Sequence, residues 1–156
     1  MKKSIIFLAS FLICSLLFGC QSQDSQQETV AQEVLSNLLT APNEDYQNAL
    51  LSFDGSSEQE VFDSVSSIMG GHATDALLEA LVMDGVGLQL SSVVDGFTSI
   101  PGNIVLTETE QAGLYDFEAT VSIHRNNSDP EETTFIGQIR FNSDHKIDLF
   151  SMRELN

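Results

Sequence analysis

The thiol of Cys20 is the first candidate for chemistry, and it follows Gly19 at the end of an apolar run. The run covers Ile5–Phe18 and comes after a basic start at Lys2 and Lys3. Its length is that of the hydrophobic region of a secretory signal, and it falls short of the roughly 20 residues that a membrane-spanning helix needs. The segment therefore predicts targeting rather than a permanent membrane span.

The four residues Leu17-Phe18-Gly19-Cys20 resemble the lipobox of bacterial lipoprotein precursors. The resemblance implies that residues 1–19 are a signal peptide that is cleaved off, and that Cys20 receives diacylglycerol. It also implies an extracytoplasmic protein that is lipid-anchored to the cell membrane, because buried acyl chains hold an N-terminus at the bilayer. An uncleaved signal anchor with an incidental cysteine is the alternative.

The residues after Cys20 predict a flexible tether over residues 20–29. Gln21–Thr29 is polar and has almost no apolar side chains, so burial of apolar surface cannot offset the entropy lost on folding.

Both cysteines of the chain are accounted for by the predicted signal peptide and anchor. Cys14 lies inside the predicted signal peptide, and acylation would occupy the sulfur of Cys20. The mature chain would then hold neither a free thiol nor a disulfide, which excludes thiol chemistry and zinc sites built on cysteine.

Charge narrows the choice of partners. The chain has 6 basic and 23 acidic residues, and loss of Lys2 and Lys3 with the signal peptide would leave four basic residues and a net charge of −19. Nucleic acid and anionic lipid head groups would both be repelled, since each is bound by clustered Lys and Arg. Solubility, divalent cations or a cationic partner are all consistent with this acidity.

Residues 30–156 predict a single α+β domain, because helical spacing in the first half gives way to alternation in the second. We expect four helices, and residues 88–94 could form a short fifth one. The four span about residues 30–39, 43–53, 57–69 and 74–83, and Pro42 and Gly70-Gly71 end the first and the third. The second is expected to bury Tyr46, Ala49, Leu50 and Phe53.

Four strands are expected after the helices. They cover residues 103–109, 115–124, 133–141 and 146–155 and are joined by polar turns. In the second strand, odd-numbered residues from Tyr115 to Ile123 are apolar, which predicts one buried and one wet face. In the last strand the apolar phase changes between Leu149 and Phe150, which favours a bulge or apolar contacts on both faces. We therefore expect the N-terminal helices to pack on a four-stranded antiparallel sheet.

The stretches LYDFEATVSIHR, TTFIGQIRF and KIDLFSM are similar to the closing strands of the nuclear transport factor 2-like and cystatin-like α+β fold. The resemblance implies a curved sheet around the helices and, in some members, a pocket between them. Tyr46, Tyr115, Asp116 and His124 are the candidate residues for such a pocket, with the two tyrosines as ligand-binding residues. Period two places Asp116 and His124 opposite Tyr115, so we predict no catalytic set.

No metal or cofactor site is predicted. The histidines at 72, 124 and 145 include no pair at the helical i, i+4 spacing, and no HExxH motif occurs. Asp129, Glu131 and Glu132 are acidic, but they lack the alternating positions and the fixed glycine of a calcium loop. No glycine-rich phosphate loop opens a helix.

Two classes of function follow. The favoured one is a membrane-tethered, non-enzymatic binding or interaction module of the cell envelope, with a protein or peptide partner. The alternative is a pocket domain for a small apolar ligand, with an isomerase- or dehydratase-like enzyme as its remote extension. A filled helix–sheet interface would favour the first, and an apolar cavity with converging polar groups would favour the second.

Overall fold

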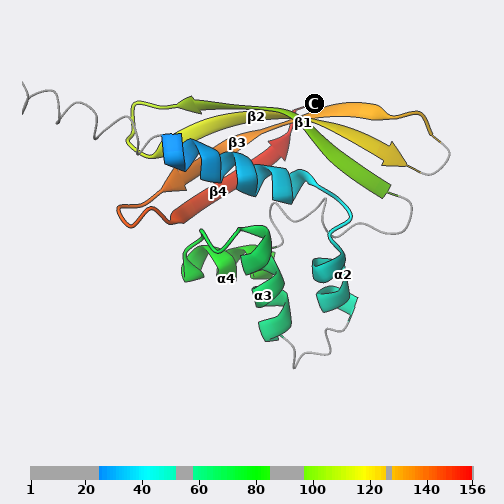
Figure 1. Ribbon diagram of the computed structural model, residues 1–156, viewed down its shortest axis with the longest axis horizontal. Coiled ribbons are helices and arrows are strands. Elements are labelled where there is room, and N and C mark those ends of the chain that lie inside the picture. Colours follow the sequence, from blue (N-terminus) through cyan, green and yellow to red (C-terminus); the bar gives the residue numbers. More distant parts are fainter. Residues whose placement is uncertain (1–24, 52–57, 85–96, 126–127, 156) are drawn as a thin grey trace, which may run out of the picture.

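The structure is a computed structural model, and it describes residues 25–51, 58–84, 97–125 and 128–155. Within these ranges four helices precede a four-stranded antiparallel sheet, which confirms the predicted α+β class (Figure 1). The first helix covers residues 25–39 and is called the N-terminal helix. The others are Glu44–Leu51 (α2), Glu58–Ile68 (α3) and Asp75–Asp84 (α4), and the strands are Phe97–Glu108 (β1), Leu114–Arg125 (β2), Glu131–Phe141 (β3) and Ile147–Glu154 (β4).

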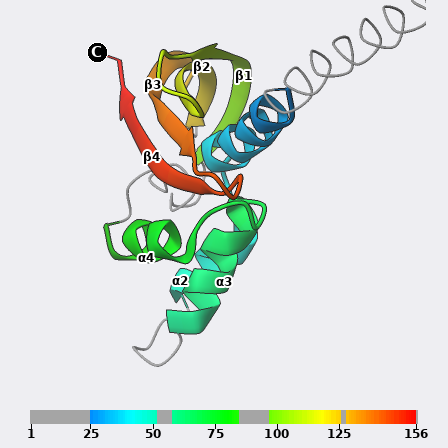
Figure 2. The same cartoon turned by 90° about the vertical axis from the view of Figure 1, so that its left-hand side faces the viewer.

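The sheet is a meander in which each strand pairs with its neighbour in sequence, in the order β1-β2-β3-β4. Figure 2 shows that it curves beside the N-terminal helix. Arg140 pairs with Leu149 whereas Phe141 pairs with Ile147, so Asp148 is an extra residue on β4. The bulge expected from the phase change in this strand is confirmed.

The N-terminal helix lays one apolar face against the sheet. Five of its side chains are completely buried, namely Ala31, Val34, Leu35, Leu38 and Leu39. Residues 25–29, which the sequence assigned to the flexible tether, are helical, and this part of the prediction is wrong. Gln and Glu are good helix formers, and extending an existing helix needs no new nucleus. Residues 20–24 of the predicted tether lie outside the described residues.

A buried serine joins the end of the N-terminal helix to β1. The hydroxyl of Ser99, with no exposed surface, donates a 2.7 Å hydrogen bond to the carbonyl of Leu39. The backbones of Ser99 and Ala41 also exchange two hydrogen bonds of 3.0 and 3.1 Å. A carbonyl at a helix C-terminus lacks an intrahelical partner, so Ser99 satisfies one such group while it fixes the sheet edge.

Helix α3 ends at the glycine pair that the sequence marked as a stop. Gly70 and Gly71 both have positive φ, 59° and 68°, and their amides donate to the carbonyls of Ser67 and Ser66. This is the Schellman arrangement, in which glycine takes the left-handed conformation at the helix end. The predicted stop is confirmed, whereas residue 57, where this helix was expected to begin, lies outside the described residues.

Helices α2, α3 and α4 form a second group beside the N-terminal helix and the start of β4 (Figure 1). The side-chain amide of Asn37 donates to the carbonyl of Ile68 at 3.2 Å, which links the N-terminal helix to α3. The amide of Ile147 donates to the carbonyl of His72, and the amide of Thr74 donates to the carbonyl of Ile147, at 2.8 and 2.9 Å. The segment before α4 is thereby fixed to the first residue of β4.

Two details of the predicted elements need correction, and two others lie outside the described residues. Leu50, expected in the core with Tyr46 and Ala49, is 39% exposed. The strand expected from residue 103 begins at Phe97, six residues earlier. Phe53 and the possible helix at residues 88–94 lie outside the described residues.

Candidate functional site

The two tyrosines proposed as ligand-binding residues are both core residues. The ring of Tyr115 is completely buried on β2 and meets Phe141 edge-on, with ring centroids 6.1 Å apart. Tyr46 is 5% exposed on α2, and its burial raises the pKa of its hydroxyl. Neither tyrosine lines any of the hollows described below. A ligand-binding role for Tyr46 or Tyr115 stays a prediction.

Asp116 and His124 lie on the face of β2 opposite Tyr115, as period two predicted. Asp116 is exposed and His124 is half-buried, with Nε2 3.2 Å from the hydroxyl of Ser122. Eight residues separate them along one strand, which corresponds to about 26 Å at about 3.3 Å a residue. The fold therefore does not bring Asp116, His124 and Tyr115 together.

The remaining candidates from the sequence are the possible metal ligands, the turn residue His145 and the cysteine Cys20. Within the described ranges, no three His, Cys, Asp or Glu side chains gather in a way that could hold a metal ion. His145 lies in the turn between β3 and β4, where its Nδ1 is 3.3 Å from Nε2 of Gln27. Cys20 lies outside the described residues, so its lipidation stays a prediction.

Side chains fill the space between the N-terminal helix and the sheet. The helix contributes the five fully buried residues given above, and the facing strands contribute Tyr115, Ala119, Val121, Ile139 and Ile147, each without exposed surface. Phe117 adds a stacked contact with Phe150, with ring centroids 6.0 Å apart and planes inclined by 8°. Such dense packing leaves a ligand little room in this layer.

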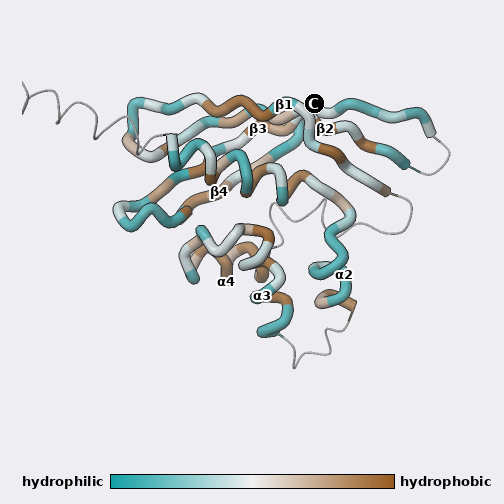
Figure 3. The backbone as a smooth tube through the Cα atoms, viewed as in Figure 1, coloured by the Kyte–Doolittle hydropathy of each residue, from teal (hydrophilic) through white to brown (hydrophobic). Residues whose placement is uncertain are grey.

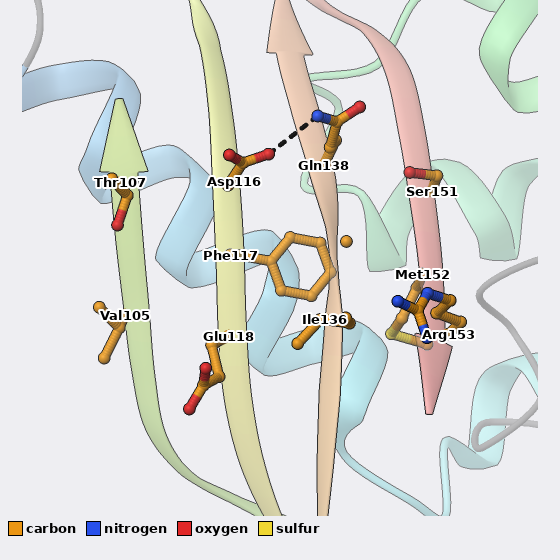
Figure 4. Close-up of a pocket in the computed structure, with 11 residues that line it drawn as sticks. Val105, Thr107, Asp116, Phe117, Glu118, Ile136, Gln138, Ser151, Met152 and Arg153 are labelled. Carbon is orange, nitrogen blue, oxygen red and sulfur yellow. Dashed lines mark hydrogen bonds between the residues drawn. The ribbon is translucent and has the colours of Figure 1, made fainter. Parts of the chain in front are cut away.

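The opposite face of the sheet carries two rows of side chains that cross all four strands (Figure 4). The first row is Thr107, Asp116, Gln138 and Ser151, and the second is Val105, Glu118, Ile136 and Arg153. Within the first row, Nε2 of Gln138 donates a 2.8 Å hydrogen bond to Oδ1 of Asp116. We call these eight residues the open face, and seven of them are exposed while Ile136 is half-buried.

A hollow of about 610 Å³ lies over the open face, and Phe117, Gly137 and Met152 also line it. Gly137 is required by close packing, because a Cβ there would lie 1.9 Å from the backbone oxygen of Ser151 and 2.8 Å from the ring of Phe117. The missing side chain lets the ring of Phe117 lie across β3, a known way in which an aromatic residue covers a strand glycine. The hollow therefore combines an apolar centre with polar surroundings.

The open face offers three kinds of group to a partner or a ligand. Asp116 and Glu118 offer carboxylate acceptors, Arg153 offers guanidinium donors, and Val105 and Ile136 offer apolar contact. An apolar centre inside a polar rim is the usual anatomy of a protein interaction surface.

Two ion pairs lie elsewhere on the sheet. Arg140 binds Asp148 through two hydrogen bonds of 2.8 and 3.3 Å, and this carboxylate raises the pKa of the guanidinium. Arg125 forms a 2.9 Å ion pair with Glu131 beside the turn between β2 and β3. Both pairs tie neighbouring strands together, and surface pairs of this kind contribute little to stability.

Sequence reasoning missed most of the open face. Asp116 was considered, but Gln138, Ile136 and Arg153 were not, since each is unremarkable in its own strand. The register of the strands places these residues opposite one another. The available sequence signal was that each one is adjacent to a predicted core position in its strand and therefore faces away from the core.

Comparison of the chain with protein-family models, with curated proteins and with solved structures finds no match. The similarity to the nuclear transport factor 2-like and cystatin-like fold therefore rests on the strand pattern alone. Among the described helices, none combines the length and the apolar character needed to cross a bilayer.

Proposed function

We propose that this chain is a bacterial lipoprotein, anchored at the extracytoplasmic face of the cell membrane through Cys20, whose folded part is a non-enzymatic binding module of the cell envelope. The lipobox-like residues Leu17–Cys20 support the anchor. The open face supports the binding module, because its two rows place polar, charged and apolar groups on one rigid sheet. The filled helix–sheet layer favours this function over a pocket for a small ligand.

The proposed anchor would keep the open face near the membrane. Five residue steps separate Cys20 from Ser25, the first described helical residue, and an extended chain spans at most about 18 Å over that interval. The partner proposed for the open face is accordingly an envelope protein or peptide that comes close to the bilayer. The strong negative charge of the chain makes an anionic partner unfavourable.

The anchor is tested by Cys20→Ser in the natural host. The proposal expects the variant protein to leave the membrane fraction or to accumulate as the uncleaved precursor. Membrane partition and mature mass equal to those of the wild type would refute lipidation. The matched control is Cys14→Ser, which changes the other cysteine and leaves the lipobox-like residues intact.

The binding role is tested by a photo-crosslinking residue placed in intact cells at Val105 or at Arg153. The control position is Gln32, which is exposed on the N-terminal helix. The proposal expects the same crosslinked partner from both positions of the open face, none from Gln32, and loss of the product at Val105 when Arg153→Glu is added. Equal products at all three positions, or no product at the open face, would contradict it.

A further inference from the structure

Helices α2, α3 and α4 enclose a second hollow, of about 740 Å³, that shares no residue with the open face. We call it the helical groove. Its lining residues are Leu50 from α2, Glu58, Gln59, Val61 and Phe62 from α3, and Asp75, Glu79, Val82 and Met83 from α4.

The floor of the helical groove is apolar, and exposed apolar side chains lie at or next to its lining residues. Val61 is buried, and Phe62 and Val82 are partly buried against the core. Met83 is 83% exposed and Leu51, next to the groove residue Leu50, is 86% exposed. Figure 3 shows that hydrophobic residues gather along α4. Large exposed apolar side chains beside an apolar hollow are typical of a site of contact.

Every ionisable residue that lines the helical groove is acidic, namely Glu58, Asp75 and Glu79. The sequence holds no Lys or Arg between Lys3 and Arg125, and helices α2, α3 and α4 contain no basic side chain. A neighbouring hollow between α2 and α3 adds three more carboxylates, from Asp45, Glu60 and Asp63. The groove therefore has an apolar floor under a negative potential.

We propose that the helical groove binds a cationic amphipathic helix of a partner protein. Such a helix presents apolar anchors at i, i+3, i+4 and i+7, which suit the floor, and flanking Lys or Arg side chains, which suit the acidic rim. A second copy of this chain is a poor occupant, because its own helices carry the same negative charge. A small apolar ligand would leave the exposed surfaces of Leu51 and Met83 uncovered.

The test measures binding of a synthetic 18-residue Leu/Lys amphipathic helix to the purified protein in zwitterionic nanodiscs, with empty nanodiscs subtracted. Two control peptides have the same length: one replaces Lys by Glu, and one scrambles the Leu positions so that no apolar face forms. We expect saturable binding of the Leu/Lys helix, at least tenfold weaker binding of both controls, and a loss of affinity as salt rises.

Three variants assign the binding to the helical groove. Met83→Ser removes exposed apolar surface, and Glu79→Gln removes one rim charge, so each is expected to weaken binding at least threefold while the fold is kept. Ile100→Ser is the matched control, since Ile100 is also an exposed apolar residue, at 57%, but lies on β1 and lines neither the open face nor the helical groove. We expect this control to bind as the wild type does.

Several results would overturn the proposal. They are an absence of binding, equal binding of the Leu/Glu peptide, and equal loss in all three variants. A dimer in light scattering that Met83→Ser dissociates would assign the groove to a second copy instead. The inference does not depend on lipidation, because the groove is tested whether or not Cys20 carries lipid.

Discussion

The hydroxyl of Tyr115 donates a 3.3 Å hydrogen bond to Oε1 of Gln27, so the first described turn of the N-terminal helix is tied to β2. The same Gln27 side chain lies 3.3 Å from the ring of His145 in the turn between β3 and β4. Gln27 falls within the segment that composition marks as a tether. The contact therefore shows that the folded part of the chain includes residues only a few positions after Cys20.

The first prediction concerns this contact. Gln27→Ala is expected to reduce the free energy of unfolding by about 0.5–1.5 kcal/mol, the usual net value of one hydrogen bond. Combined with Tyr115→Phe in a double-mutant cycle, it should give a coupling energy of similar size, measured by urea unfolding. Gln26→Ala, at an exposed neighbouring position, is the control. Equal stabilities of the two alanine variants would contradict the predicted role of Gln27.

The second prediction concerns the alternation of β2. Phe117 is 3% exposed and stacks on Phe150, so Phe117→Ala is expected to cost about 3–5 kcal/mol of unfolding free energy. Asp116→Ala changes the next residue on the exposed face and should cost less than about 1 kcal/mol. Chemical denaturation of both variants checks the register. A loss below about 1 kcal/mol for Phe117→Ala would mean that this face is not packed as described.

The sequence predicted β2 well because its alternation is unbroken from Tyr115 to Ile123. It predicted β1 poorly because the inward-facing residues change from odd to even numbers along that strand. Register is interrupted between Pro101 and Ile104, where one extra residue shifts the phase. A search for strict period two therefore finds only the part of β1 after the bulge. It misses Ser99, a buried polar residue whose hydroxyl bonds to the carbonyl of Leu39, far away in the sequence.

The candidate surfaces were harder to predict than the fold, for a physical reason. Asp116 and Gln138 meet only because strand pairing places them opposite each other, 22 residues apart in sequence. Leu50 was expected in the core from helical spacing, yet spacing cannot tell which neighbouring helix covers a residue, and 39% of Leu50 stays exposed at the helical groove. Packing between distant segments decides both the contact of Asp116 with Gln138 and the exposure of Leu50. The local hydrophobic pattern of a single sequence does not reveal such packing.

A third prediction follows from the close packing at Gly137. An added Cβ would lie 1.9 Å from the backbone oxygen of Ser151, which no side-chain movement relieves. Gly137→Ala is therefore expected to cost more than about 4 kcal/mol, an exceptional value for one substitution. At Gly102 the nearest atom to an added Cβ is the oxygen of Thr120 at 3.3 Å, so Gly102→Ala should cost far less. Circular dichroism melts that show equal losses would contradict this reading of the sheet.

The fourth prediction is a pH dependence at Tyr46. Burial disfavours the charged phenolate, which raises the pKa of this hydroxyl above its ordinary value near 10. Below that value both the folded and the unfolded chain keep the proton, and stability is unaffected. Above it the unfolded chain releases the proton first, so stability falls as pH rises toward the higher pKa of the folded state.

Tyr46→Phe removes that contribution. The variant should therefore lose less unfolding free energy than the wild type between pH 8 and pH 11, when both are measured by urea denaturation at the same salt concentration. Other titrating groups act equally on both proteins, so the difference reports on Tyr46. An identical loss in the two proteins would show that this hydroxyl is not desolvated.

We propose that acylated Cys20 anchors this acidic binding module outside the cell, and the decisive experiment is intact-mass spectrometry of the protein extracted from its natural membrane. We expect a chain that lacks residues 1–19, begins at Cys20 and carries the added mass of a diacylglyceryl group. A mass that matches the complete sequence with an unmodified thiol would rule out the lipid anchor.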